Sequence, residues 1–263
     1  MLGAICGDVI GRPYEFEAPT TNYDFELFTD QSRFSDDTVM TAAVADAILN
    51  GRAFEVSLVE FGVRHIEGGY GKSFKAWLLD ANRQPGTSFG NGSAMRASPV
   101  GWLSDSLADT IGLAWRSAMP SHGHPEGIKG AIAAAAAVRL ALDGKPPEEV
   151  RNVIASLTGY DMHRSVEQIR ANYPRFKVTC QDSVPEAIIC AIEATSYEDA
   201  IRKAVSLGND ADTQAAIAGS IAEVYFGVPD GIAERALSTL THDLREVCDQ
   251  FVVRTAHLRA SGR

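Results

Sequence analysis

The sequence has no long hydrophobic run, no paired-cysteine motif and no excess of basic residues. The apolar N-terminus, residues 1–11, is short, lacks a basic flank and contains Asp8, so it predicts neither a signal peptide nor a membrane span. The four cysteines show no C-x-x-C spacing, which favours reduced, buried thiols in a cytoplasmic protein. A net charge of −10, from 24 basic and 34 acidic residues, disfavours binding to nucleic acid or to anionic membranes through bulk charge.

Several catalytic motifs are also missing. The sequence contains no G-x-S-x-G elbow and no convincing Cys/His pair, so covalent serine or thiol catalysis is disfavoured. No group of His and Cys residues has the spacing of zinc ligands. The glycine-rich segments match neither a P-loop nor a dinucleotide-binding fingerprint, because no Lys-Ser/Thr pair follows and no strand precedes them.

Alternating apolar and polar runs are scarce, and the segment 175–180 is the only modest strand candidate, equally compatible with an extended loop. Helical periodicity dominates instead. It predicts helices over residues 2–11, 37–49, 54–67, 71–80, 93–103, 106–117, 125–142, 147–156, 183–194, 197–206, 211–225 and 243–258. Motifs near both ends of the chain need each other, so we expect a single all-α domain over 1–263.

Small residues follow one face of the first predicted helix. Gly3, Gly7 and Gly11 are four residues apart and therefore lie on one stripe, which allows a second helix to approach closely. Ala131, Ala134 and Ala135 form a similar small face. Such faces suit a compact bundle of helices that cross at various angles.

The segment "FSDDTVM", residues 34–40, begins a predicted helix. Ser35 is a good N-cap, and Asp36 and Asp37 in the first turn complement the helix dipole, so an ordinary helix start explains them. A second segment, "NDADT" over 209–213, repeats this pattern about 170 residues later. Two such helix starts favour a different interpretation, in which carboxylates are held rigid and ionised as ligands for a hard divalent cation.

A third acidic element follows the first helix, where Glu15, with Glu17 as the alternative, could join Asp36, Asp37, Asp210 and Asp212. Unneutralised carboxylates about 4 Å apart would each cost roughly 4 kcal/mol at an effective dielectric near 20. Converging acids therefore require cations between them. Together with the hydroxyls of Ser35 and Thr213, this set would suit two Mg²⁺ or Mn²⁺ ions.

Two polar loops are candidates for binding the rest of a ligand. Gly90, Asn91, Gly92 and Ser93 precede a predicted helix that begins near residue 94, and their backbone N–H groups could hold a phosphate, although a capped turn explains the sequence almost as well. The loop "SHGHPEG" offers His122 and His124 as donors near an anionic ligand, although loop histidines are usually solvated.

These motifs, in this order, resemble the signatures of the ADP-ribosylglycohydrolase family. The matching segments are "GAICGDVIGRPYE", "FSDDTVM", "FGNGSAMRASPVG", "SHGHPEG" and "LGNDADTQAAIAGSIAEVYFG", and they extend from residue 3 to residue 227. The family usually has Thr where Ser35 stands, and Gly where Asn209 stands. Both replacements preserve the chemistry, since Ser35 keeps the hydroxyl and Asn tolerates unusual backbone angles.

The resemblance implies a compact orthogonal multi-helix bundle with a dinuclear Mg²⁺ or Mn²⁺ site. The implied metal ligands are Glu15, Ser35, Asp36, Asp37, Asp210, Asp212 and Thr213. The glycine loop, residues 90–93, would bind the diphosphate of ADP-ribose, and His122 would contact the ligand. Asp36 is the expected general base, with Glu15 as the competing residue.

The implied activity is hydrolysis of the glycosidic bond between ADP-ribose and an acceptor, either a protein side chain or a small molecule. The expected partner is thus an ADP-ribose-containing substrate, including an ADP-ribosylated protein. Two alternatives stay open: a catalytically silent module that binds ADP-ribose or a nucleotide, and a two-metal hydrolase of another nucleoside or nucleotide sugar. The segment 67–86 is the expected acceptor loop, although Tyr70, Phe74 and Trp77 within it are better explained as packing residues.

Overall fold

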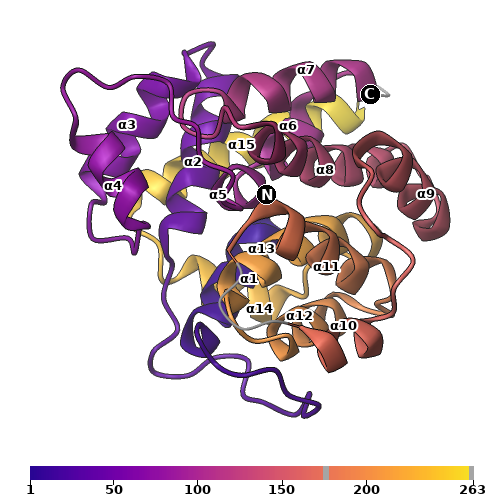
Figure 1. The fold of residues 1–263 in the computed structure, drawn as a ribbon. Helices are drawn as coiled ribbons and strands as arrows, with labels where there is room; N and C mark the ends of the chain where they lie inside the picture. Colours follow the sequence, from indigo (N-terminus) through magenta and orange to yellow (C-terminus); the bar gives the residue numbers. More distant parts are fainter. Residues whose placement is uncertain (174–177, 261–263) are drawn as a thin grey trace.

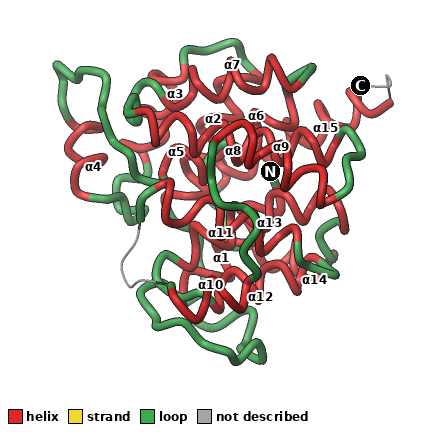
Figure 2. The backbone as a smooth tube through the Cα atoms, turned by 45° about the vertical axis from the view of Figure 1, so that its right-hand side comes forward, coloured by secondary structure: helices red, strands yellow, loops and turns green. Residues whose placement is uncertain are grey.

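A computed structural model describes residues 1–173 and 178–260, and in this part the chain consists of helices joined by loops (Figure 1). Figure 2 shows helices and loops and no strand in the described residues; two isolated bridges, Thr87 with His122 and Gly90 with Thr179, are the only β pairing there. The all-α class is therefore confirmed. Residues 175–177 of the strand candidate lie outside the described residues, and Cys180 at its end already begins a helix.

The elements follow one another along the chain as a series of short and medium helices. They are α1 (Leu2–Gly11), η1 (Arg12–Tyr14), α2 (Asp36–Leu49), α3 (Phe54–Arg64), α4 (Lys72–Leu79), α5 (Gly92–Met95), α6 (Ser98–Leu103), α7 (Leu107–Ala118), α8 (Pro125–Leu142), α9 (Pro147–Thr158), α10 (Val166–Asn172), α11 (Cys180–Ile192), α12 (Tyr197–Ser206), α13 (Ala211–Phe226), α14 (Asp230–Leu237) and α15 (His242–Ala260).

Three predictions about the helices were wrong. Periodicity missed α10 and α14, which have seven and eight residues and so provide too short a window for the pattern to emerge. The expected helix over 93–103 is two helices, because Pro99 lies in the first turn of α6 and cannot donate to a preceding turn. The helix expected to reach residue 67 ends at Arg64.

Helix α1 lies directly against α13, and the glycine stripe explains how. A Cβ built on Gly3 would stand 2.2 Å from the carbonyl oxygen of Gly219, and one on Gly7 would stand 2.1 Å from that of Ala215. Real side chains cannot occupy these positions, so only glycine permits this approach. The contact brings the C-terminal end of α1 next to the N-terminal end of α13, where Gly11 meets Asp212.

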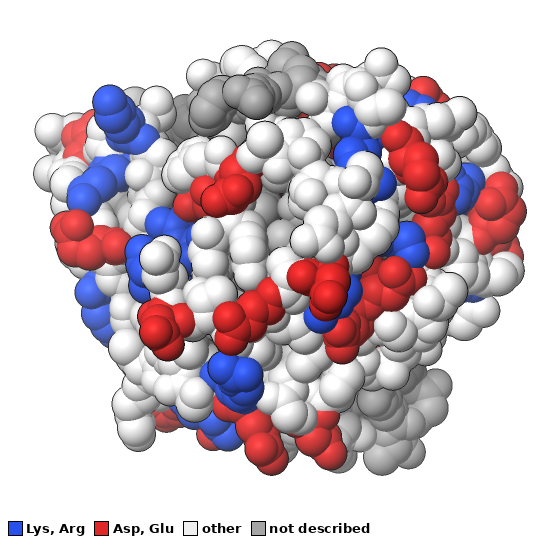
Figure 3. Space-filling model, turned by 90° about the horizontal axis from the view of Figure 1, so that it is seen from below, with Lys and Arg blue, Asp and Glu red and all other residues white. Residues whose placement is uncertain are grey.

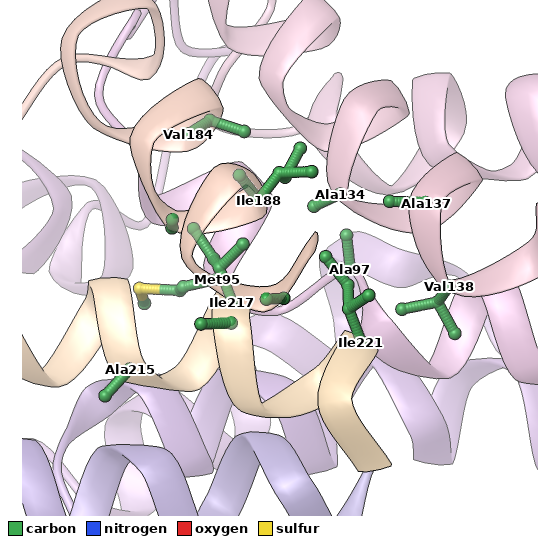
Figure 4. Close-up of a cluster of buried hydrophobic side chains, with 14 of the residues drawn as sticks. Met95, Ala97, Ala134, Ala137, Val138, Val184, Ile188, Ala215, Ile217 and Ile221 are labelled. Carbon is green, nitrogen blue, oxygen red and sulfur yellow. The ribbon is translucent and has the colours of Figure 1, made fainter. Parts of the chain in front are cut away.

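The core between α8, α11 and α13 is built largely from small side chains. Figure 4 shows Ala134 and Ala137 of α8 near Ile188 of α11 and Ile217 and Ile221 of α13. Alanines on α8 allow the helix axes to approach, and the isoleucines fill the remaining space. This packing fixes the N-terminal end of α13 relative to the rest of the fold.

The surface carries the negative charge that the composition predicts. Figure 3 shows Asp and Glu side chains in a band across one face, with Lys and Arg scattered among them. None of the helices in the described residues has the length and apolarity needed to cross a bilayer.

Candidate metal centre and ligand pocket

The acidic motifs converge where α1, α2 and α13 meet. Ser35 is the N-cap of α2, and its hydroxyl accepts a hydrogen bond from the N–H of Asp37 at 3.2 Å. Asp36 and Asp37 therefore occupy the first turn of α2, while Asp210 is the N-cap residue of α13 and Asp212 lies in its first turn. At α2 the Ser35 cap holds the turn that presents Asp36 and Asp37, whereas the side chain of Asp210 makes no capping hydrogen bond at α13.

Two groups of three acids each bring one carboxylate oxygen per residue within 4.8 Å of the others. One group consists of Asp8, Asp37 and Asp212, and the other of Glu15, Asp210 and Asp212. Asp212 belongs to both, so the two groups adjoin. Thr213 reaches this centre through its hydroxyl, which donates to Oδ2 of Asp37 at 3.1 Å.

The segment that carries Glu15 is tied to the turn before α13. The N–H of Phe16 donates to the carbonyl of Asn209, and the N–H of Asn209 donates to the carbonyl of Glu17. Phe16 and Asn209 both have positive φ angles, 70° and 62°; Asn tolerates this region, whereas a bulky residue such as Phe rarely adopts it. Glu15 consequently faces the centre, whereas the alternative candidate Glu17 is exposed.

Burial and mutual repulsion make the ionised state of these carboxylates costly. Burial, followed by the negative charge of Asp212, raises the pKa of Asp8 to about 6, that of Glu15 to about 7 and that of Asp36 to about 8. The same two causes raise the pKa values of Asp37 and Asp210 well above their usual range. The centre thus has a local excess of negative charge that a cation would relieve.

A guanidinium already relieves part of this charge. Arg12 follows α1 and pairs with Glu15 and, at 3.0 Å, with Oδ2 of Asp212. Oδ1 of Asp37, by contrast, is buried and has no hydrogen-bond partner among the described residues. A buried carboxylate oxygen without a donor in a group of acids fits a cation with oxygen ligands.

The centre opens into a pocket of about 410 Å³. Its lining includes all five predicted carboxylates, Thr213, most of the glycine loop and His122; the residues concerned are Glu15, Asp36, Asp37, Asp210, Asp212, Thr213, Gly90, Asn91, Gly92 and His122. Ser35 and Ser93 do not line it. Ser35 is buried beneath Asp37, and the hydroxyl of Ser93 donates to the carbonyl of Gly127 at 2.6 Å.

The glycine loop is connected to the acidic centre by Asn91. Its side-chain amide donates to Oδ2 of Asp210 at 2.6 Å and to the hydroxyl of Ser183 at 3.2 Å. The N–H groups of Gly90 and Asn91 already donate to Ser88 and Val178. The amides left for a ligand are therefore those at the start of α5, Gly92 and Ser93, which have no acceptor within that helix.

Sequence reasoning did not select three charged residues of this region. Asp8 is fully buried in α1 and belongs to one of the two acidic groups, and Arg12 pairs with the other. Arg96 is fully buried in the pocket wall. A charged residue within an apolar segment was the available signal for Asp8 and for Arg96, since such residues are rarely buried without a partner.

The pocket wall also contains Phe74 from the expected acceptor segment. Tyr70 and Phe74 pack with ring centroids 5.6 Å apart, and Trp77 stacks on Phe74 at 5.4 Å. Tyr70 and Trp77 do not line the pocket, whereas Phe74 does. Packing thus accounts for two of the three aromatic residues, and Phe74 both packs and faces the ligand space.

Fold and site together define an all-helical protein in which a carboxylate-rich centre adjoins a glycine loop. A family model described as ADP-ribosylglycohydrolase matches residues 1–261, and the chain belongs to this family. It is 26% identical to the human protein named ADP-ribosylhydrolase ARH3, over 87% of this chain and 84% of that protein. It is 27% identical to ADP-ribosylarginine hydrolase Tri1 of Pseudomonas putida, over 87% of this chain and 70% of that protein.

A solved structure supports the fold. The chain superposes on a protein titled "ADP-ribosylglycohydrolase-related protein complex" with a TM-score of 0.70, and the match covers 95% of both chains. At 23% sequence identity this similarity establishes the architecture alone. The compact helical bundle expected from the family signatures is therefore confirmed.

Proposed function

We propose that this protein is a metal-dependent hydrolase that cleaves the glycosidic bond between ADP-ribose and an acceptor. The observation that carries the proposal is the pair of acidic groups that share Asp212 at the floor of one pocket. Family membership supports the ADP-ribosyl part of the substrate, and the names of the two relatives support hydrolysis. The acceptor is left open by relatives of about a quarter identity.

The residues present fit two Mg²⁺ or Mn²⁺ ions. The ligands we propose are the carboxylates of Glu15, Asp36, Asp37, Asp210 and Asp212 with the hydroxyls of Ser35 and Thr213. When bound, such ions supply Lewis acidity toward ribose hydroxyls and water. Oδ1 of Asp37 has no hydrogen-bond donor among the described residues, and the pKa values of Asp37 and Asp210 are raised. Both observations support this assignment, because a bound cation would supply the positive charge that these carboxylates lack.

The polar pocket wall would bind the diphosphate. ADP-ribose carries negative charge, and a protein with a net charge of −10 needs local donors to hold it. Four groups provide such donors: the amides of Gly92 and Ser93 at the start of α5, the ring of His122 and the ammonium group of Lys72. The ribose next to the diphosphate would then lie over the carboxylates.

Asp36 is the residue that we propose as general base. It lines the pocket and makes no ion pair among the described residues, whereas the competing residue Glu15 is paired with Arg12. An unpaired carboxylate at the pocket surface is free to accept a proton from an attacking water. Pairing with the guanidinium of Arg12 opposes the rise in the pKa of Glu15, which reaches about 7, compared with about 8 for Asp36.

The direct test measures free ADP-ribose released from peptides ADP-ribosylated on arginine or serine and from an ADP-ribosylated nucleobase. We expect release from at least one substrate with Mg²⁺ and loss of release with a chelator. Asp36→Asn should lower kcat by at least 100-fold. The control is Asp143→Asn, which changes an exposed acid at the C-terminal end of α8 and should leave kcat unchanged. Absence of release from the whole panel would refute the proposal, and calorimetry would then show whether ADP-ribose binds without turnover.

A further inference from the structure

A fully buried arginine lies in the wall of the ligand pocket. One terminal nitrogen of Arg96 donates to the carbonyl oxygen of Ser117 at 3.0 Å and to the hydroxyl oxygen of Ser121 at 2.9 Å. No carboxylate of the described residues forms an ion pair with it. Burial lowers the pKa of Arg96 to about 9, so the guanidinium remains charged near neutral pH.

The hydroxyl of Ser121 connects this arginine to His122. Its oxygen lies 2.8 Å from Nδ1 of His122, and the contacts with Arg96 and His122 are the two hydrogen bonds that Ser121 Oγ makes within the described residues. An arginine only donates, so it occupies a lone pair of the oxygen. The single hydroxyl proton of Ser121 then has one acceptor in reach, Nδ1 of His122.

From these contacts we infer that Ser121, oriented by Arg96, is a positioning residue that fixes His122 as the tautomer with its proton on Nε2. The opposite tautomer would place two donors on Ser121 and leave the hydroxyl proton of a buried side chain without an acceptor. The cost of such an unmade hydrogen bond favours the tautomer with its proton on Nε2 by roughly 5- to 150-fold.

The nitrogen that carries the proton faces the glycine loop. A Cβ built on Gly92 would stand 3.1 Å from Nε2 of His122, and one on Gly90 would stand 3.9 Å from it. His122 lines the same pocket as these glycines and is 5% exposed. The N–H of Nε2 therefore joins the amides at the start of α5 as a donor for an anionic oxygen.

The charge of Arg96 acts in the same direction as the hydrogen bonds. Burial, followed by the nearby guanidinium, lowers the pKa of His122 well below its usual value. A neutral ring with a fixed tautomer donates one hydrogen bond and needs no counter-ion when the pocket is empty. Arg96 meanwhile supplies positive potential near the ring from a fully buried position, and its guanidinium carbon lies over the ring of Phe74, 5.9 Å from the ring centroid.

The role of this N–H in binding ADP-ribose rests on the proposed function, whereas the tautomer of His122 does not depend on it. If ADP-ribose binds with its diphosphate at the glycine loop, the N–H of His122 is presented in advance and no ring flip or proton transfer is needed on binding. Pre-organised donors of this type strengthen binding because their orientation is fixed before the ligand arrives.

The experiment is a long-range ¹H–¹⁵N correlation spectrum of the full-length protein labelled on histidine, with His122 assigned by its loss in His122→Gln. We expect a pyridine-like Nδ1 resonance and a pyrrole-like Nε2 resonance for His122, unchanged between about pH 6 and pH 8. In Ser121→Ala the pattern should shift toward a mixture of tautomers. A protonated Nδ1 or an imidazolium in the unmodified protein would overturn the inference.

A matched control removes a different buried hydroxyl next to the same arginine. The hydroxyl of Ser117 donates to Ala114 within its own helix, and Arg96 contacts only the backbone of Ser117. Ser117→Ala should therefore leave the His122 spectrum unchanged. A shift in Ser117→Ala equal to that in Ser121→Ala would mean that loosened packing, and not the relay, controls the tautomer.

Binding of ADP-ribose separates this inference from the proposed function. Ser121→Ala should weaken ADP-ribose binding about tenfold, the effect of one impaired hydrogen bond to a charged group, and Ser117→Ala should not. The expected spectrum without ADP-ribose binding would support the relay and contradict the proposed function. Binding of ADP-ribose with the opposite tautomer would overturn the relay and leave the proposed function to the release assay.

Discussion

Asp8 is fully buried in α1, yet it accepts four hydrogen bonds from the start of α2. The N–H and hydroxyl of Ser35 and the N–H and hydroxyl of Thr38 all donate to its carboxylate. The N-terminus of α2, which presents Asp36 and Asp37, is thereby fixed to α1. A buried acid in an apolar helix has a dual role here, because Asp8 also belongs to one of the two acidic groups.

Replacement of this carboxylate by an amide tests that anchoring. In Asp8→Asn one oxygen becomes an NH₂ group that cannot accept, so at least one donor at the α2 terminus loses its partner. We expect Mg²⁺ affinity to fall 10- to 100-fold, as is typical when a group that orients metal ligands is removed. Isothermal titration calorimetry with Mg²⁺ measures this directly.

Asp46→Asn is the appropriate control for Asp8→Asn. Asp46 is a buried acid near the other end of α2, where it accepts from Asn50, Arg52 and Ser57. Its loss should lower stability and leave Mg²⁺ affinity unchanged. Equal affinities in the two variants would contradict the role given to Asp8.

Ser35 raises the question of whether one hydroxyl can cap a helix and bind a cation. It donates to Oδ1 of Asp8 at 2.7 Å and accepts from the N–H of Asp37, which leaves one lone pair of the oxygen uncommitted. Ser35→Ala should cost about 1 kcal/mol of stability as a lost cap. We also expect Ser35→Ala to lower Mg²⁺ affinity at least tenfold. Ser35→Thr keeps the hydroxyl and should retain the full affinity. A loss of stability with full affinity would leave Ser35 a cap alone.

The candidate metal ligands could be selected from the sequence because they lie in short local motifs. "SDDT" and "NDADT" are helix starts, and cap chemistry makes such segments recognisable without a fold. Asp8, Arg12 and Arg96 could not be selected in this way. Asp8 and Arg96 have their partners in other segments, and Arg12 pairs with distant Asp212 as well as with nearby Glu15, so the significance of these residues depends on tertiary contacts that no spacing rule contains.

At the scale of helices, the glycine stripe of α1 was predictable and its partner was not. Spacing by four places Gly3, Gly7 and Gly11 on one face, but the close approach to α13 emerges only in three dimensions. The missed helices α10 and α14 are short, so tertiary packing determines them more than periodicity does.

A single methyl group on this stripe tests how closely the two helices must pack. In Gly7→Ala the added Cβ would stand 2.1 Å from the carbonyl oxygen of Ala215, and backbone cannot yield as a side-chain tip can. We expect a loss of about 3 kcal/mol in the free energy of unfolding, measured by urea denaturation. Because α1 and α13 carry Asp8 and Asp212, Mg²⁺ affinity should fall as well.

Gly112→Ala is the matched control in the exposed part of α7. A Cβ at Gly112 would meet nothing within 4 Å, so alanine should stabilise the protein by up to about 1 kcal/mol through helix propensity. Similar stability changes in the Gly7 and Gly112 variants would contradict the close packing of α1 on α13.

Across the whole molecule, segments from both ends of the sequence complete one centre. Helix α1 contributes Asp8 and α13 contributes Asp212, with the α2 terminus between them. This arrangement supports our proposal of a single domain, and it means that a bound cation would link three helices distant in sequence. Metal binding should therefore stabilise the entire fold and not only the pocket.

The pH dependence of that stabilisation follows from the raised pKa values. Asp8, Glu15 and Asp36 have pKa values of about 6, 7 and 8 in the folded protein without metal, above the values near 4 of unfolded chains. The folded state therefore binds protons more tightly, and metal-free stability should decline as the pH rises from about 4 to about 8.

Mg²⁺ should reverse this trend because it replaces the protons. The increase in melting temperature caused by Mg²⁺ should be small near pH 5.5 and largest near pH 8, where the carboxylates must otherwise repel one another without compensation. Differential scanning calorimetry over this range, with and without Mg²⁺, measures the increase. Asp212→Asn removes the acid that both groups share, so its Mg²⁺-dependent increase should be close to zero at every pH. If Mg²⁺ raised the melting temperature equally at both ends of the range, or equally in Asp212→Asn, the carboxylates would not be its binding site.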